Sequence, residues 1–133
     1  MSTPKEQMNR KHIFAVNGSP EFLDLLRQLL QEEHYNVTTT NFVPRTYDQI
    51  ATLEPDLLLI DLAVGQRAGL DLLEHLGKEA ATRGIPVIVL STSPRLLDEA
   101  QADPGRFGGE RFLTKPFDLD ELLTMVSDLI GLA

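Results

Sequence analysis

Three side chains able to do chemistry stand directly after apolar runs. Asp61 follows Leu57-Leu58-Leu59-Ile60, Ser91 follows a run that begins at Pro86, and Lys115 follows Phe112-Leu113-Thr114. Continuous apolar runs of this length are typical of strands buried on both faces of a parallel sheet. Ligands and chemistry collect at the carboxyl ends of such strands. We therefore expect a carboxylate, a hydroxyl and an ammonium group to meet at one edge of a sheet.

Each of these residues also has an ordinary interpretation when taken alone. Asp61 or Ser91 can cap the next loop or helix, and Lys115 can be a solvated residue in a turn before Pro116. A fourth polar pair, Asn17-Gly18, follows the first apolar run. The convergence of all four strand ends favours a functional site over independent capping.

The elements that position these residues alternate regularly along the chain. The strands are expected at 13–16, 35–40, 56–61, 86–90 and 111–114. The helices are expected at 20–33, 45–53, from 69 to before 84, at 94–101 and at 119–130. Ser19 and Asp118 are the predicted N-caps, the latter with Glu121 as a capping-box partner. The stretch 102–110, with one proline and three glycines, is predicted to be a mobile loop.

The βαβαβαβαβα order predicts an α/β fold with a doubly wound parallel sheet and helices on both faces. The flavodoxin-like strand order 2-1-3-4-5 is the natural candidate, and its crevice lies between strands 1 and 3. Asn17-Gly18 and Asp61 would face each other across that crevice.

Length and composition limit the possible classes of protein. The polar stretch 1–11 suggests a flexible N-terminal tail, and the length of 133 residues suggests a single domain over 12–133. A net charge of −8 argues against nucleic-acid binding, and the lack of cysteine excludes disulfides and thiolate chemistry. No apolar run approaches the roughly 20 residues that span a membrane, so a cytoplasmic protein is expected.

With these features the chain resembles the receiver domain of two-component response regulators, the flavodoxin-like module that includes the chemotaxis regulator. The resemblance runs from about His12 to Leu132. It is carried by residues 55–62, by Gly69, by 86–91 and by Phe112-Leu113-Thr114-Lys115-Pro116-Phe117.

The resemblance implies a role for each matching position. Asp61 matches the aspartate that accepts a phosphoryl group from a histidine kinase. Ser91 and Lys115 match the hydroxyl and the lysine that contact the phosphoryl oxygens. The bond from Lys115 to Pro116 is implied to be cis, and Phe112 matches an aromatic residue that changes rotamer on activation. A carboxylate nucleophile with positive charge around the transferring oxygens suits phosphoryl transfer.

The pattern departs from the family around the metal. Receivers place two adjacent acids after strand 1, which hold Mg²⁺ together with the phosphoacceptor, whereas this chain has Asn17 and Gly18. Asp61 and a backbone carbonyl, that of Ala63, are the protein ligands left, so we expect Mg²⁺ binding to be weak or absent. Val64-Gly65 also replaces the usual Met-Pro, and glycine loosens a loop that proline would stiffen.

Two functional hypotheses follow. The first is a stand-alone receiver in a two-component or phosphorelay pathway, with Asp61 as phosphoacceptor and impaired Mg²⁺-dependent phosphorylation. Its partner would be a histidine kinase or a phosphorelay protein. The second is a pseudo-receiver that docks proteins through the fourth helix, fifth strand and fifth helix without being phosphorylated. In such a protein Lys115 can form an ion pair directly with Asp61.

A flavin-binding or hydrolytic enzyme on the same fold is a third, less favoured hypothesis. The chain lacks a Ser/Thr-rich phosphate loop after strand 1 and a tryptophan to stack on a flavin. It also has no Gly-x-Ser-x-Gly elbow, P-loop or His-Glu-x-x-His motif. We therefore expect a signalling protein rather than an enzyme.

Overall fold

The computed structural model describes residues 10–41, 45–63, 65, 67–107, 109 and 111–131. The expected tail over 1–11 lies outside these residues except for Arg10 and Lys11. No helix in the described ranges is long and apolar enough to cross a membrane.

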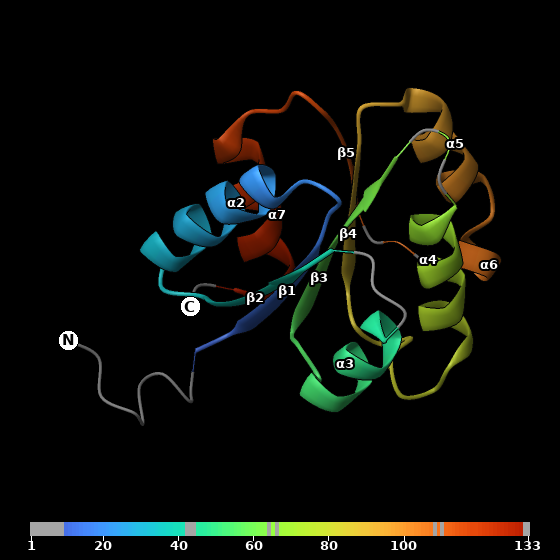
Figure 1. The fold of residues 1–133 in the computed structure, drawn as a ribbon, viewed down its shortest axis with the longest axis horizontal. Helices are drawn as coiled ribbons and strands as arrows, with labels where there is room; N and C mark the ends of the chain where they lie inside the picture. The colour runs from blue at the N-terminus through green and yellow to red at the C-terminus, as the bar shows by residue number, and fades with distance from the viewer. Residues whose placement is uncertain are drawn as a thin grey trace.

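The strands form one parallel sheet in the order β2-β1-β3-β4-β5, as predicted (Figure 1). They are β1 (His12–Val16), β2 (Asn36–Thr40), β3 (Leu57–Leu62), β4 (Val87–Ser91) and β5 (Arg111–Thr114). Every residue of β3 and β4 is buried, which agrees with their unbroken apolar runs. The fold is therefore the flavodoxin-like α/β fold expected from the sequence.

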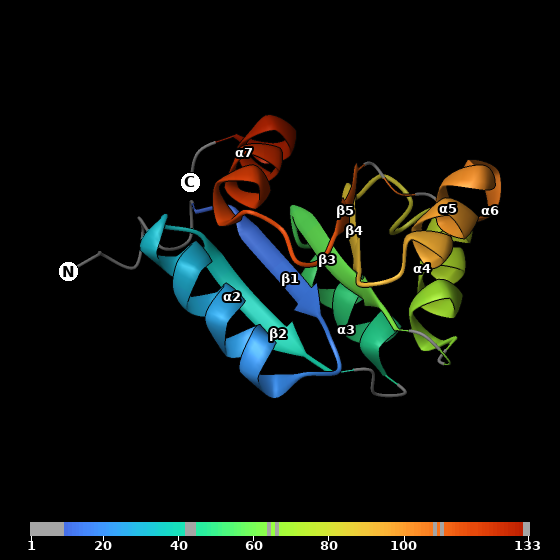
Figure 2. The ribbon, with the colours of Figure 1, turned by 90° about the horizontal axis from the view of Figure 1, so that it is seen from above.

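The helices cover both faces of this sheet (Figures 1 and 2). They are α2 (Pro20–Glu32), α3 (Thr46–Leu53), α4 (Ala68–Lys78), α5 (Pro94–Ala102), α6 (Pro104–Phe107) and α7 (Leu119–Ile130). Helices α2 and α7 cover one face, and α3, α4 and α5 cover the other. Side chains alternate between the faces along each strand, so two separate core clusters form.

We name the two clusters by the helices that close them. The α2–α7 cluster takes its strand residues from Ile13, Ala15, Leu57, Leu59, Ile88, Leu90 and Leu113. The α3–α5 cluster takes its strand residues from Phe14, Val16, Leu58, Ile60, Leu62, Val87 and Val89. The helical spacing of apolar residues predicts that Leu25 in α2 and Leu119 in α7 belong to the buried stripes of their helices, but both residues are exposed.

Helix starts follow the capping signals in the sequence. Ser19 Oγ accepts a hydrogen bond from the backbone N–H of Phe22 at 3.3 Å, and Pro20 occupies the first helical turn of α2. Asp118 caps α7, but it accepts from the N–H of Asp120 at 3.0 Å rather than from that of Glu121. The predicted N-cap is therefore correct at both helices.

The segment predicted as a mobile loop over 102–110 contains the short helix α6, so that prediction was wrong. The N–H groups of Arg106 and Phe107 both donate to the carbonyl of Asp103 at 3.0 Å. The side chain of Phe107 is buried in the α3–α5 cluster. Burial of one aromatic side chain thus orders a stretch whose proline and glycines indicated a loop.

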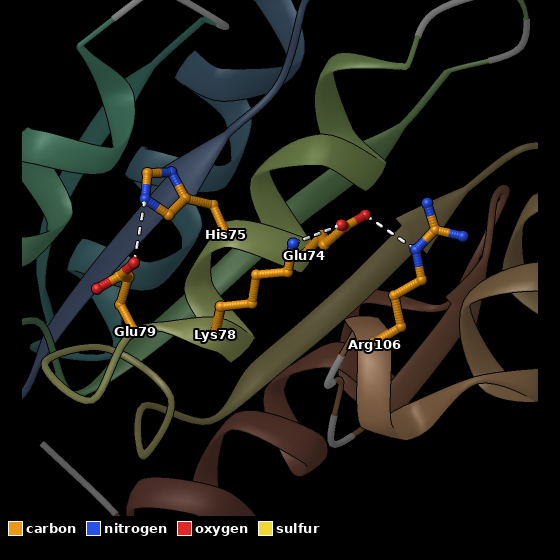
Figure 3. Close-up of polar contacts among 5 residues, drawn as sticks. All are labelled: Glu74, His75, Lys78, Glu79 and Arg106. Carbon is orange, nitrogen blue, oxygen red and sulfur yellow. Dashed lines mark hydrogen bonds and ion pairs between the residues drawn. The ribbon is translucent and has the colours of Figure 1, made fainter.

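A charge network ties α6 to α4 (Figure 3). The carboxylate of Glu74 accepts from Lys78 Nζ through one oxygen and from Arg106 Nε through the other, each at 2.9 Å. These hydrogen bonds, first from Lys78 and then from Arg106, lower the pKa of Glu74. Nearby, His75 Nε2 lies 4.0 Å from Glu79 Oε1. Lys78 and Arg106 are exposed, so the contacts hold the helices in register more than they add stability.

Helix α4 begins in close contact with the backbone of β3 at Gly69. A Cβ atom at Gly69 would lie 2.8 Å from the carbonyl oxygen of Asp61 and 2.6 Å from Leu62 Cδ2. Glycine therefore lets α4 approach the residue that carries the predicted reactive carboxylate.

We expect Gly69→Ala to lower the free energy of unfolding by about 1–3 kcal/mol, because the backbone oxygen of a central strand cannot move away. Urea denaturation measures this loss. Gly77→Ala in the same helix is the matched control, since its Cβ would meet its nearest atom at 3.6 Å. That change replaces a glycine in the last turn of α4 and should be neutral or stabilising by up to about 1 kcal/mol. Equal losses in both variants would contradict the close-approach argument.

At the opposite end of the sheet, His12 joins β1 to two neighbouring segments. Its N–H donates to Asp56 Oδ2 at 2.7 Å, and its Nε2 lies 2.7 Å from Thr38 Oγ1. Burial lowers the pKa of His12 below the ordinary 6.5, although the charge of Asp56 acts in the opposite direction. The folded protein therefore takes up the His12 proton less readily than the unfolded chain does.

We predict that His12 makes stability fall as the pH decreases below about 6.5, because the unfolded chain binds the proton first. Above that pH the contribution is fully present. Urea denaturation of the native chain and of His12→Gln, measured between pH 5 and pH 8, isolates the effect as the difference between the two curves. A difference that stays constant over this range would contradict the prediction.

Candidate functional site

The sheet brings Asn17, Asp61 and Lys115 to the same edge and the same face. Val16 pairs with Ile60, so Asn17 lies beside Asp61 in the crevice between β1 and β3. Along the chain these residues come two positions after Ala15, Leu59 and Leu113 of the α2–α7 cluster. Alternation therefore places all three side chains on the face that α2 and α7 cover.

Asp61 and Lys115 form a direct ion pair. Lys115 Nζ lies 2.5 Å from Asp61 Oδ1, and the two side chains are 11% and 18% exposed for Asp61 and Lys115 respectively. The contact has the distance of an ion pair but not the angles of a hydrogen bond, since the buried Oδ1 has no partner of that geometry. A carboxylate this buried needs a compensating charge, and the ammonium supplies it.

The ammonium of Lys115 lies over the ring of Phe22, which in turn packs against the ring of Phe117. Lys115 Nζ lies 4.2 Å from the centroid of the Phe22 ring, in the first turn of α2. The edge of one ring meets the face of the other between Phe22 and Phe117, with centroids 6.2 Å apart and planes at 78°. The helical spacing of Phe22 with Leu25 and Leu26 predicts only that this residue belongs to the apolar stripe of a helix. Its place one turn after a cap at the sheet edge is the signal that could have revealed it.

Asn17 is buried, and its amide group has a defined orientation. Oδ1 accepts a hydrogen bond from the N–H of Ser19 at 2.8 Å, whereas Nδ2 is buried with no hydrogen-bond partner. The side-chain oxygen is thus used by the turn into α2, and an unpaired N–H donor remains. Gly18 is exposed and contributes no side chain.

Ser91 and Phe112 lie on the other face of the sheet, two residues after Val89 and one residue before Leu113 respectively. Ser91 is fully buried; its Oγ donates to the carbonyl of Leu62 at 2.6 Å and accepts from the N–H of Ser93 at 3.0 Å. Phe112 packs partly buried against the α3–α5 cluster. The structure therefore brings Asp61 and Lys115 into contact and places Ser91 and Phe112 on the opposite face of the sheet.

The loops at the edge complete the site. The peptide bond between Lys115 and Pro116 is cis, and the N–H of Lys115 donates to the carbonyl of Ser91 at 2.8 Å. Ala63 directly follows β3 and is half-buried, and Gly65 has a φ of +80°, which glycine adopts without steric cost. Val64 lies outside the described residues.

The residues at this edge do not fit a Mg²⁺ ion. Mg²⁺ requires oxygen ligands, usually one or two carboxylates. The oxygen of Asn17 is bonded to a backbone N–H, its unpaired atom is a donor, and the carboxylate of Asp61 is paired with Lys115. In the described part of the chain, no group of three or more His, Cys, Asp or Glu residues could hold a metal ion. The donors present instead suit an anion.

Comparison with known proteins agrees with this geometry. The family model of the response regulator receiver domain matches residues 13–127. The transcriptional regulatory protein KdpE of Staphylococcus aureus is 33% identical over 110 residues, which cover 83% of this chain and 46% of KdpE. The dual master transcriptional regulator RpaA of Synechocystis is 28% identical over 118 residues, which cover 89% of this chain and 48% of RpaA. The chain spans about half the length of these relatives.

A solved structure shows the same fold. The solution structure of a response regulator protein from Burkholderia multivorans superposes with a TM-score of 0.70 at 28% identity, covering 90% of this chain and 94% of that one. The match over residues 13–127, the strand order and the shared fold lead to one conclusion: the chain belongs to the response regulator receiver domain family of two-component signalling.

Proposed function

We propose that Asp61 accepts a phosphoryl group in a two-component or phosphorelay pathway, and that the Mg²⁺-dependent form of this reaction is impaired. The observation that carries the proposal is the Lys115 ammonium 2.5 Å from Asp61 Oδ1, at the carboxyl edge of the sheet. Receiver domains generally use Mg²⁺ for phosphorylation, and the residues beside Asp61 do not suit that ion. The proposed phosphoryl donor is a histidine kinase or a phosphorelay protein.

Phosphoryl transfer to Asp61 requires only a small rearrangement of the side chains at this edge. An oxygen of Asp61 forms a bond to phosphorus while the bond from phosphorus to its donor breaks, and the leaving group takes the electron pair. The ammonium of Lys115 then turns from the carboxylate toward the phosphoryl oxygens and offsets their charge. The unpaired Nδ2 of Asn17 can donate to the same oxygens.

Ser91 has a different task in this proposal. Its hydroxyl donates to the carbonyl of Leu62, the residue after Asp61. To contact a phosphoryl group, the hydroxyl must leave that carbonyl and rotate toward the edge. We infer that this exchange carries the phosphorylated state toward Phe112, which lies on the same face of the sheet.

A second candidate function is the pseudo-receiver, a docking module that works without phosphorylation. The same direct ion pair favours it, because Lys115 already neutralises Asp61 in the absence of a metal ion. Its docking face would be α5, β5 and α7.

Incubation with acetyl phosphate, with and without Mg²⁺, distinguishes the two functions. We expect intact mass measurement to show the addition of one phosphoryl group at a slow rate that Mg²⁺ changes little. Asp61→Asn is the matched control and should gain no mass. The absence of the adduct in the native chain at long times would reject the phosphoacceptor and favour the pseudo-receiver.

We also predict that Mg²⁺ binds weakly, because Asn17 and Gly18 provide no carboxylate. A titration into the millimolar range, followed by the NMR amide shifts of Gly18 and Asp61, should show small changes that do not saturate. Asp61→Asn should give the same small changes. Tight, saturable shifts that disappear in Asp61→Asn would refute this prediction.

A further inference from the structure

We propose that Phe22 is a positioning residue for Lys115: the face of its ring binds the ammonium and holds it against Asp61. The inference rests on the proposed function of Asp61 and Lys115 and adds a third residue to their site. Lys115 Nζ lies 4.2 Å from the Phe22 ring centroid and 2.5 Å from Asp61 Oδ1. The ammonium therefore contacts a carboxylate and a π face at the same time.

The ring has the fixed position that such a role requires. The N–H of Phe22 donates to Ser19 Oγ, and the N–H of Ser19 donates to Asn17 Oδ1. This chain of hydrogen bonds connects the ring to the end of β1, beside Asp61. Phe117 packs its ring against Phe22, with the two planes at 78°. The ring is thus supported by α2 and by the segment that follows Lys115.

Electrostatics explains why an aromatic ring is useful here. A lysine ammonium is a point charge on a flexible stem, so a single carboxylate leaves it considerable freedom. Asn17 and Gly18 bring no negative charge that could restrain it further. The face of an aromatic ring carries partial negative charge, and its attraction for a cation increases when water is excluded. Lys115 is 18% exposed, which meets that condition.

The ring also leaves the charge balance of the pair unchanged. A second carboxylate in its place would compete with Asp61 for Lys115 and repel an incoming phosphoryl group. The ring attracts the ammonium without adding a formal charge. Lys115 is therefore held beside Asp61 with donors free to meet the phosphoryl oxygens, which is positioning in advance of the reaction.

NMR of the unphosphorylated protein tests the contact directly. Protons held over a ring face are shielded, so the Hε resonances of Lys115 should lie upfield of an ordinary lysine. Phe22→Leu keeps an apolar side chain but removes the π face, and should return these resonances to the ordinary position. Phe22→Tyr should preserve the upfield shift. Phe117→Leu removes the ring that packs against Phe22 but leaves the face of Phe22 in place, so it should reduce the upfield shift less than Phe22→Leu does.

The rate of labelling by acetyl phosphate tests the consequence. Phe22→Leu should slow labelling of Asp61 by about twofold to thirtyfold, the range expected from a cation–π contact. Phe22→Tyr should restore the rate. In a Lys115→Met background, Phe22→Leu should have no further effect, because Phe22 acts through Lys115. Thermal unfolding of each variant shows whether it remains folded.

The outcomes separate this inference from the proposed function. Hε resonances of Lys115 that do not move in Phe22→Leu, or an equal loss of rate in both Lys115 backgrounds, would overturn the positioning role. A native chain that is not labelled at all would reject the phosphoacceptor function. In that case the NMR comparison of Phe22→Leu, Phe22→Tyr and Phe117→Leu still decides whether Phe22 holds Lys115.

Discussion

The ion pair between Asp61 and Lys115 is the contact on which the arrangement of the site depends. β3 and β5 are not neighbours, because β4 lies between them. Asp61 pairs with Leu90 of β4, and Leu90 pairs with Leu113 of β5. Lys115, two residues beyond Leu113, therefore reaches across β4 to the carboxylate. A shift of register in either pairing would leave a buried acid without its compensating charge.

The alternation of side chains divides the site into two halves. The acid and the cation lie on the face that α2 and α7 cover, while Ser91 and Phe112 lie on the face of the α3–α5 cluster. The halves meet where Ser91 Oγ donates to the carbonyl of Leu62, one residue after Asp61. Gly69 permits α4 to pack against the carbonyl of Asp61 itself. A change at the carboxylate is thus one peptide unit away from the opposite face of the sheet.

Much of this architecture could be predicted because strong local signals agreed with one another. Buried parallel strands are continuous apolar runs, and the residues after them must lie at one edge, so the positions of Asp61 and Lys115 followed. The strand order came from the flavodoxin-like fold that the βα alternation favours. Helix α6 could not be predicted, because four residues are too few to show a helical period and Pro104 and Gly105 are typical of loops. Its order comes from burial of Phe107, a tertiary effect.

The contact of Phe22 with Lys115 could not be predicted either, because it too depends on tertiary packing. An aromatic residue at helical spacing is expected to face the core, and periodicity carries no information about which charged group approaches its ring from a distant part of the chain. The exposure of Leu25 and Leu119 shows a second limit of helical spacing as a predictor of burial. Spacing predicts the direction of an apolar stripe, but its width depends on how far the sheet beneath extends.

The orientation of Asn17 determines what kind of ligand the edge can accept. An amide offers one oxygen and one N–H₂ group, and the turn into α2 uses the oxygen through the N–H of Ser19. The remaining group is a donor, and Asn17 lies at the same edge and on the same face of the sheet as Lys115. Around the single carboxylate of Asp61, the described side chains therefore present N–H groups and a positive charge. Such a set is complementary to the oxygens of a phosphoryl group, whereas a divalent cation would be repelled by the donors and would have to displace Lys115.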